Sequence, residues 1–160
     1  MGPMEANHPN SQPIARFHGR FRQKIDEKGC VSLPAIFRRA VPAEGENGTL
    51  ILREGPDGYL QAVSVQEWES RIERLSEAQP SKGKDGRWRR RKLVGSVVPA
   101  SIDDKGRFTI PRELLDVAGI GRDCLILGVD RAIEIWNPDR YFELEAQHDT
   151  DLSDVEDILF

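Results

Sequence analysis

A short polar motif that carries lysine, and in one copy arginine, occurs twice in the chain, 77 positions apart. One copy is Asp103-Asp-Lys-Gly-Arg-Phe-Thr-Ile-Pro111, and the earlier one is Asp26-Glu-Lys-Gly-Cys-Val-Ser-Leu-Pro34. A polar turn followed by an alternating strand and a proline, present twice, indicates a duplicated unit. Lysine is suited to phosphate groups, and arginine is suited to both phosphates and guanine edges. The chemistry that these residues favour is therefore the binding of a polyanion.

The basic residues of the motif have separate expected roles in contact with double-stranded DNA. Arg107 is suited to a bidentate contact with guanine in the major groove. Lys28 and Lys105 are better suited to phosphate oxygens. Gly29 and Gly106 supply the positive φ angle that such a turn needs and allow the backbone to approach a phosphate closely.

The aspartates of the motif are not expected to touch DNA, because a carboxylate repels it. Asp26 and Asp103 are expected to brace the turns through backbone N–H groups or to orient the arginine. Asp-x-Lys-Gly is also a good hairpin turn in its own right, so one copy alone leaves a purely structural role open. Two copies in basic surroundings favour the DNA interpretation.

Charge is unevenly distributed along the chain. The net charge is −4, but residues 16–39 carry seven basic side chains against two acidic ones, and residues 82–112 carry ten against three. The chain after residue 122 is strongly acidic. Segregated charge of this kind gives one face that attracts a polyanion. The further DNA-binding candidates are Arg20, Arg22, Arg38 and Arg112. The alternative is ordinary solvated surface charge.

Length and composition exclude several classes of protein. The chain has 160 residues, 38% of them hydrophobic and 31% charged, which fits one globular domain or two small halves that share a core. Its apolar stretches are too short to cross a bilayer, and its first residues lack the apolar segment of a secretory signal. Cys30 and Cys124 are not closely spaced, so we expect reduced thiols in a cytoplasmic protein and no disulfide or zinc site.

Enzymatic activity is not expected. Asp103 and Asp104, with Lys105 nearby, are the only candidates for a metal site. His18 has no evident cysteine or histidine partner, and His148 lies near the acidic tail. The sequence shows no nucleophile–base pair, phosphate-binding glycine loop or metal-ligand spacing. We therefore expect no cofactor, no metal and no small-molecule substrate.

Hydrophobic periodicity predicts the same series of elements in each half: strand, turn, strand, short helix, hairpin and longer helix. In the first strand, Phe17, Phe21 and Ile25 share one face. Ser64 and Glu67 form a capping box at the start of the longer helix. The predicted elements span 17–25, 31–33, 35–40, 49–53, 59–63 and 64–75 in the first half. Those of the second half span 97–102, 107–110, 111–118, 124–129, 132–136 and 138–144.

These elements predict two repeats that need one another. A single half exposes too much apolar strand surface, so the halves are expected to close into a small barrel-like β core with helices outside, an α+β fold that is mainly β. The expected organisation is a disordered segment (1–16), a first repeat (17–80), a basic linker helix (81–94), a second repeat (95–145) and an acidic flexible tail (146–160).

The order and spacing of these motifs resemble the MraZ family and its wider AbrB-type, swapped-hairpin relatives. The resemblance covers roughly residues 17–145. The second copy of the motif carries it, with Lys105-Gly-Arg-Phe-Thr-Ile-Pro-Arg-Glu-Leu114 after an acidic pair. It is supported by Asp26-Glu-Lys-Gly29, Leu33-Pro-Ala-Ile-Phe-Arg38, Gly58-Tyr-Leu60, Glu67-Trp68 and Ile133-Glu-Ile-Trp136.

The resemblance implies a pseudo-twofold double-split barrel in a bacterial transcriptional regulator. Such proteins bind short repeated DNA boxes ahead of the division and cell-wall gene cluster. They assemble as rings of several subunits in the cytoplasm, on the nucleoid. The family's DNA-contacting signature is an aspartate followed four residues later by an arginine. Asp103 and Arg107 match it, whereas the position after Asp26 holds Cys30, so one of the two sites departs from the pattern.

Two alternatives stay open. AbrB-type folds also serve as antitoxins that bind a toxin through an acidic extension, and the composition of residues 149–160 fits such an extension. Antitoxins of this type usually carry one repeat per chain, whereas this chain has two. The basic run of residues 87–92 is suited either to DNA phosphates or to the acidic tail of a neighbouring subunit.

Overall fold

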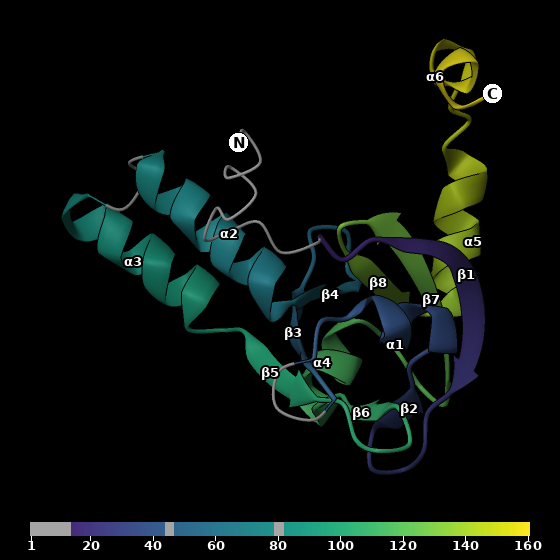
Figure 1. Cartoon of the computed structure of the whole chain (residues 1–160), viewed down its shortest axis with the longest axis horizontal. Coiled ribbons are helices and arrows are strands. Elements are labelled where there is room, and N and C mark those ends of the chain that lie inside the picture. Colours follow the sequence, from purple (N-terminus) through teal and green to yellow (C-terminus); the bar gives the residue numbers. More distant parts are fainter. Residues whose placement is uncertain (1–13, 44–46, 79–81) are drawn as a thin grey trace, which may run out of the picture.

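Eight β-strands and six helices lie among residues 14–43, 47–78 and 82–160, which the computed structural model of the chain describes (Figure 1). The strands are β1 (Phe17–Lys24), β2 (Cys30–Ser32), β3 (Thr49–Glu54), β4 (Leu60–Ser64), β5 (Val98–Ser101), β6 (Arg107–Thr109), β7 (Asp123–Asp130) and β8 (Ile133–Trp136). The helices are α1 (Ala35–Ala40), α2 (Val65–Glu77), α3 (Gly83–Val94), α4 (Arg112–Val117), α5 (Pro138–Gln147) and α6 (Ser153–Leu159).

The strands of the two repeats are interleaved. One sheet has the order β1-β7-β8-β4-β3-β5, and β2 pairs with β6 in a second, two-stranded sheet. All of these pairings are antiparallel. Exchanging each strand with its counterpart (β1 with β5, β2 with β6, β3 with β7, β4 with β8) reverses the order of the larger sheet and leaves it otherwise unchanged. The strand order therefore has pseudo-twofold symmetry, and β1 and β5 each find their partner in the other repeat.

The expected α+β architecture, mainly β with antiparallel strands, is confirmed. The larger sheet is open, because β1 pairs only with β7 and β5 only with β3 among the described strands. It does not close on itself, so the double-split barrel stays a prediction.

A single main core fills the space between the two sheets and the short helices. The alternation of apolar and polar residues in the strands sends counterpart side chains inward from both repeats. Phe17 packs edge-on against Phe37, with ring centroids 5.5 Å apart. Other members of this core come in counterpart pairs, namely Ile25 with Ile102, Val31 with Phe108 and Leu33 with Ile110. These buried side chains anchor the short strands β2 and β6 in the core, and this packing fixes the position of the turns that precede the two strands.

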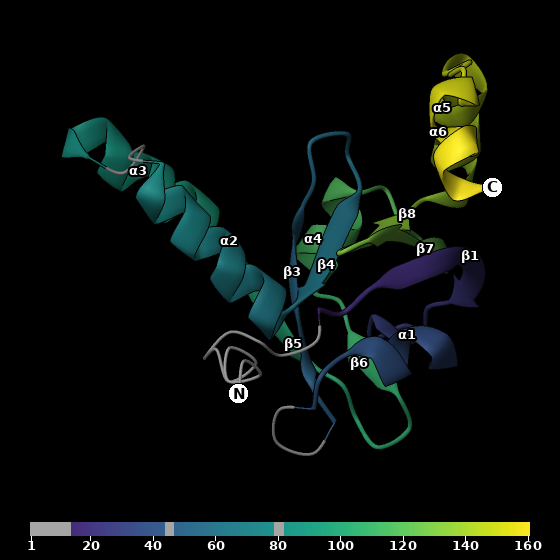
Figure 2. The same cartoon turned by 45° about the horizontal axis from the view of Figure 1, so that its top comes forward.

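The longer helices lie at opposite ends of the molecule. Helix α2 begins at the predicted capping box, where Ser64 Oγ accepts a hydrogen bond of 3.1 Å from the Glu67 N–H. Helices α2 and α3 project from one side of the sheets, and α5 and α6 from the other, in both views (Figures 1 and 2). No helix in the described ranges is long and apolar enough to cross a membrane.

The predicted elements recur in the structure with small shifts at their ends. The basic helix begins at Gly83 and the last strand of the second hairpin spans Ile133–Trp136. Part of the tail, Ser153–Leu159, forms helix α6. The predicted disordered segment, 1–16, lies outside the described residues up to position 13.

Candidate nucleic-acid interface

The two copies of the motif fold into the same turn. In turn 1 (residues 26–30), Asp26 Oδ1 accepts hydrogen bonds of 2.9 Å from the backbone N–H groups of Lys28 and Cys30. The Gly29 N–H donates to the Asp26 carbonyl at 3.0 Å. The Asp26 carboxylate thus accepts hydrogen bonds from two backbone N–H groups of the turn.

Turn 2 (residues 103–107) repeats this arrangement. Asp103 Oδ1 accepts from the N–H groups of Lys105 and Arg107, both at 2.9 Å, and the Gly106 N–H donates to the Asp103 carbonyl at 3.0 Å. The agreement between the two turns follows from local sequence, since an aspartate that accepts two backbone N–H bonds is a self-contained unit.

Glycine is required in both turns. Gly29 and Gly106 have φ angles of 86° and 77°, in the left-handed region. A Cβ atom on Gly29 would collide with the Ile110 carbonyl, and one on Gly106 would collide with the guanidinium of Arg38. The backbone beside Gly29 therefore leaves no room for a side chain, whereas a side chain at position 106 would require Arg38 to move aside.

The short ladder between β2 and β6 ties the two turns together. Its register pairs Cys30 with Thr109 and Ser32 with Arg107. Beyond the ladder, the Leu33 N–H donates to the Gly106 carbonyl and the Ile110 N–H donates to the Gly29 carbonyl, each at 2.9 Å. These crossed bonds place each turn against the strand end of the opposite repeat. Both turns lie at the same edge of the molecule, beside the labels β2 and β6 in Figure 1.

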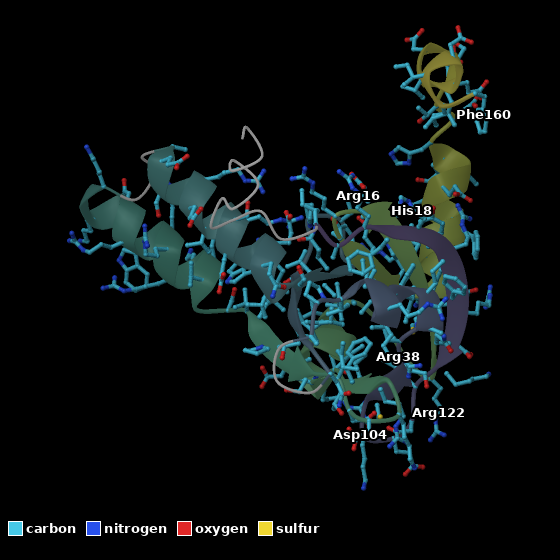
Figure 3. The ribbon with its side chains drawn as sticks, in the orientation of Figure 1. Arg16, His18, Arg38, Asp104, Arg122 and Phe160 are labelled. Atoms are coloured by element: carbon cyan, nitrogen blue, oxygen red, sulfur yellow. The ribbon has the colours of Figure 1, made fainter. Side chains whose placement is uncertain are left out.

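The second acidic residue of each turn contacts a residue that lies just before a strand of the larger sheet. Glu27 Oε1 lies 3.4 Å from Arg122 Nη2, just before β7. At the counterpart position, Asp104 Oδ1 accepts a hydrogen bond of 2.8 Å from Asn47 Nδ2, just before β3. Figure 3 shows Asp104 and Arg122 at the edge that carries the turns. Arg122 was not predicted as a site residue, because only the register of β1 against β7 brings it to turn 1.

Each turn also has an arginine from a helix of the opposite repeat. Arg38 of α1 lies directly against Gly106 of turn 2. Arg112, the first residue of α4, donates from Nη2 to the Glu27 carbonyl of turn 1 at 3.4 Å. The structure therefore brings together five of the seven predicted basic residues: Lys28, Lys105, Arg107, Arg38 and Arg112.

The other two predicted cations, Arg20 and Arg22, face α5 instead of the turns. Arg20 Nη2 lies 3.1 Å from Glu145 Oε2, and its guanidinium lies 5.3 Å from the centre of the Tyr141 ring. Arg22 lies 5.7 Å from the centre of the Phe142 ring. The hydrogen bond with Arg20 lowers the pKa of Glu145 and raises that of Arg20, with the Tyr141 hydroxyl adding to the first effect. The alternation of apolar and polar residues along β1 predicted that Arg20 and Arg22 lie on its exposed face, but it did not predict that α5 lies beside that face.

The two turns differ at one chemically important position. In turn 2, Arg107 Nε donates to Asp103 Oδ2 at 3.1 Å, while its side chain stays 43% exposed. In turn 1 the same position holds Cys30, whose thiol is free and half-buried. At positions 30 and 107 the pseudo-twofold frame therefore presents one oriented guanidinium, not two. Lys28 and Lys105 are exposed, and neither ammonium forms an ion pair with another residue in the described part of the chain.

Both bracing carboxylates have a pKa below the ordinary value of an aspartate. The backbone hydrogen bond from Cys30 is the main cause that lowers the pKa of Asp26, and the positive charge of Arg107 in the other turn adds to it. The pKa of Asp103 is lowered chiefly by the backbone N–H of Arg107 and further by its side chain. Arg107 thus contributes to the lowered pKa of both carboxylates, although for Asp26 it is the smallest of the causes.

Among the residues that the structure describes, no group of three or more histidine, cysteine, aspartate or glutamate side chains could hold a metal ion. Asp103 and Asp104, the pair considered for such a site, instead bind Arg107 and Asn47. The surface beside the turns carries exposed cations, and Asp103 orients one of them, Arg107.

Comparison with known proteins identifies the family. The family model described as "MraZ protein, putative antitoxin-like" matches residues 97–160. The chain is also similar to proteins that carry the name Transcriptional regulator MraZ, for example the following three. The protein of Thermomicrobium roseum is 33% identical over 125 residues, 78% of this chain and 84% of the relative, and that of Acetivibrio thermocellus is 33% identical over 125 residues, 78% and 83%. The protein of Chlorobium luteolum is 33% identical over 141 residues, 82% and 90%. The chain belongs to the MraZ family, a family of transcriptional regulators and not of enzymes.

Proposed function

We propose that the protein regulates transcription by binding double-stranded DNA, with sequence specificity, through turn 1 and turn 2. The observation that carries this proposal is that the turns, duplicated in sequence, have the same geometry and are joined by the crossed bonds Leu33–Gly106 and Ile110–Gly29. Their lysines are exposed and unpaired in the described part of the chain, and an oriented arginine lies in turn 2.

Arg107 is the residue proposed to distinguish bases. Its Nε is occupied by Asp103, which orients the guanidinium and leaves the two terminal nitrogens to act as a fork. A fork of this kind matches the O6 and N7 acceptors of guanine in the major groove, and a good bidentate pair discriminates by about 1–3 kcal/mol. Asp103 acts as a positioning residue and does not itself touch DNA.

The remaining cations at this edge are proposed to contact phosphates. Lys28 and Lys105 extend from the turns, and Arg38 and Arg112 flank them. Such contacts fix the register of a protein on the duplex without carrying sequence information. They make binding strongly dependent on salt, because each neutralised phosphate releases counterions.

One subunit offers a small contact surface, so we propose that affinity comes from several subunits acting together. A ring of subunits would present repeated pairs of turns to repeated boxes, and the effective concentration of the second pair would strengthen binding. The proposed targets are promoter boxes of the division and cell-wall gene cluster. The proposed location is the cytoplasm, on the nucleoid.

Arg107→Ala tests the proposal, with Arg16→Ala as the matched control. Arg16 is half-exposed and pairs with Asp130 at 2.7 Å, as Arg107 pairs with Asp103, but it lies away from the turn edge (Figure 3). Binding to a cognate box and to its scrambled version is measured by fluorescence anisotropy at several salt concentrations. We expect Arg107→Ala to lose the preference for the cognate box and Arg16→Ala to keep it. An Arg107→Ala protein that still prefers the cognate box would refute the site.

A second candidate is an antitoxin-like module that binds a protein partner. The observation that favours it is the exposed apolar surface of α6, where Ile158 and Leu159 are 82% and 71% exposed. This candidate predicts a small partner that co-purifies in fixed stoichiometry and is released when Ile158 and Leu159 are replaced by serine. Under that candidate Arg107→Ala would leave the partner bound.

A further inference from the structure

Helix α3 presents an unusual concentration of positive charge to solvent. Its 12 residues include six lysines and arginines and one acidic residue, Asp85. All of its residues are exposed except Gly86, Leu93 and Val94. Like charges three or four positions apart destabilise a helix, so a surface of this kind favours an anionic partner.

The exposed face of α3 also has an apolar centre. Trp88 is 50% exposed, and the guanidinium of Arg91 lies 4.8 Å from the centre of its ring. At about 100° per residue, Lys84 and Arg91 lie to one side of Trp88 and Lys92 to the other. The face of α3 defined by Lys84, Trp88, Arg91 and Lys92 is therefore an apolar centre between cationic flanks.

Helix α6 has the opposite pattern. Val155, Ile158 and Leu159 are 46%, 82% and 71% exposed. At about 100° per residue they share one arc, and Asp154 and Glu156 lie on its two sides. Residues 149–160 contain five acidic side chains and no lysine or arginine. Helix α6 thus presents an apolar centre between anionic flanks. The face of α3 has the same arrangement with cationic flanks, so the two surfaces are complementary in charge.

The two helices of one chain lie at opposite ends of the molecule, with the sheets between them, in both views (Figures 1 and 2). We propose that α6 of one copy docks on the Lys84–Trp88–Arg91–Lys92 face of α3 in a second copy of this chain. Contact of this kind is head-to-tail: each copy offers a different surface at each end. Repetition of a head-to-tail contact gives a closed ring or an open filament, depending on the rotation between neighbours. This inference rests on the assembly of several subunits proposed above, for which it names the contact, and it is independent of the proposed DNA contacts at turn 1 and turn 2.

A charge-swap experiment tests the pairing of the two helices. One variant is Asp154→Lys/Glu156→Lys, and the other is Arg91→Glu/Lys92→Glu. Alone, each variant brings like charges together at the contact, so we expect self-association, measured by sedimentation velocity, to weaken by about tenfold or more. Mixed in equal amounts, the two variants restore opposite charges at every contact if they alternate, so the mixture is expected to associate as the unaltered protein does.

The matched control places the same kind of charge change on the opposite faces of the two helices. The control substitutions are Asp157→Lys and Arg90→Glu. Around the helix axis, Asp157 lies about 160° from Val155 on α6, and Arg90 lies about 160° from Trp88 on α3. Neither control is expected to change self-association. All substituted positions are exposed, and circular dichroism verifies that each variant is folded.

Three outcomes overturn the proposal. The first is an unaltered protein that stays monomeric at high micromolar concentration. The second is association that the two charge-swap variants leave unchanged or that their mixture fails to restore. The third is an α3 variant that loses affinity for DNA while its self-association is intact, which would assign α3 to phosphate contacts. Loss of DNA discrimination in Arg107→Ala bears only on the turns and leaves this proposal standing.

Discussion

Replacing Cys30 with arginine is expected to give turn 1 the base contact that it lacks. Cys30 is the counterpart of Arg107, and its N–H donates to Asp26 as that of Arg107 donates to Asp103. Both bonds that Asp26 accepts from the backbone use Oδ1. A new guanidinium at position 30 can therefore pair with Oδ2, as Arg107 does in turn 2.

The size of the effect follows from the number of base contacts. One bidentate contact between arginine and guanine discriminates by about 1–3 kcal/mol. That range corresponds to a factor of about 5 to 150 in the ratio of dissociation constants for cognate and non-cognate boxes. Cys30→Arg should gain a factor in this range for a box with guanine at the symmetry-related position. Arg107→Ala should lose a similar factor.

Fluorescence anisotropy with boxes that differ at single base pairs measures this gain, and two variants make the comparison sharp. Cys30→Lys adds the same charge without the fork, so it should tighten binding to all boxes alike and steepen the dependence on salt. Cys30→Arg in the Arg107→Ala background should restore discrimination from the other turn.

Two results would contradict this reasoning. If Cys30→Arg and Cys30→Lys behaved alike, charge alone would explain binding and turn 1 would not lie against base edges. If Cys30→Arg failed to restore discrimination in the Arg107→Ala background, the two turns would not be equivalent in contact with DNA, despite their matching backbone geometry.

Two further predictions concern the turns themselves. Gly106→Ala should cost about 1–2 kcal/mol of unfolding free energy in urea, the strain of a left-handed alanine, because Arg38 can move aside. Gly29→Ala should cost more, because its Cβ meets the backbone carbonyl of Ile110, and equal costs would contradict this picture. The second prediction follows from the lowered pKa of Asp26 and Asp103. A carboxyl group whose pKa is lowered by folding stabilises the folded state at pH values above its ordinary pKa of 3.8. This stabilisation is lost as the pH falls through the lower pKa of the folded state. Amide resonances of the turns, followed by NMR during acidification, should therefore shift only below pH 3.8. A midpoint at or above that value would show that the backbone bonds to the carboxylates do not form in solution.

The parts of the fold that depend on neighbours in sequence were predictable. The turns formed by Asp-x-Lys-Gly, the capping box at Ser64 and the alternation of Phe17, Phe21 and Ile25 all act within a few residues. Duplication strengthened these predictions, because two independent stretches with one pattern seldom arise by chance.

What sequence reasoning missed depends on pairing between distant strands. The neighbours of Arg122 and Arg20 are set by the register of β1 against β7 and by the position of α5, and no local pattern encodes either. The open edge strands are a further example, since periodicity predicts that two halves share a core but not whether the sheet closes. Arg38 and Arg112 were predicted from charge alone. Only the structure shows that each of them contacts the turn of the opposite repeat.

The interleaved strands have a consequence for synthesis of the chain. While only residues 17–77 have left the ribosome, β1 and β2 have no partner strand and β3 has only β4, since β5, β6 and β7 are not yet made. Unpaired strand edges and uncovered apolar faces of this kind are prone to bind other nascent chains. The first repeat must therefore wait for the second before its sheets are complete, and its strand edges stay unpaired until β7 and β8, the partners of β1 and β4, have been made.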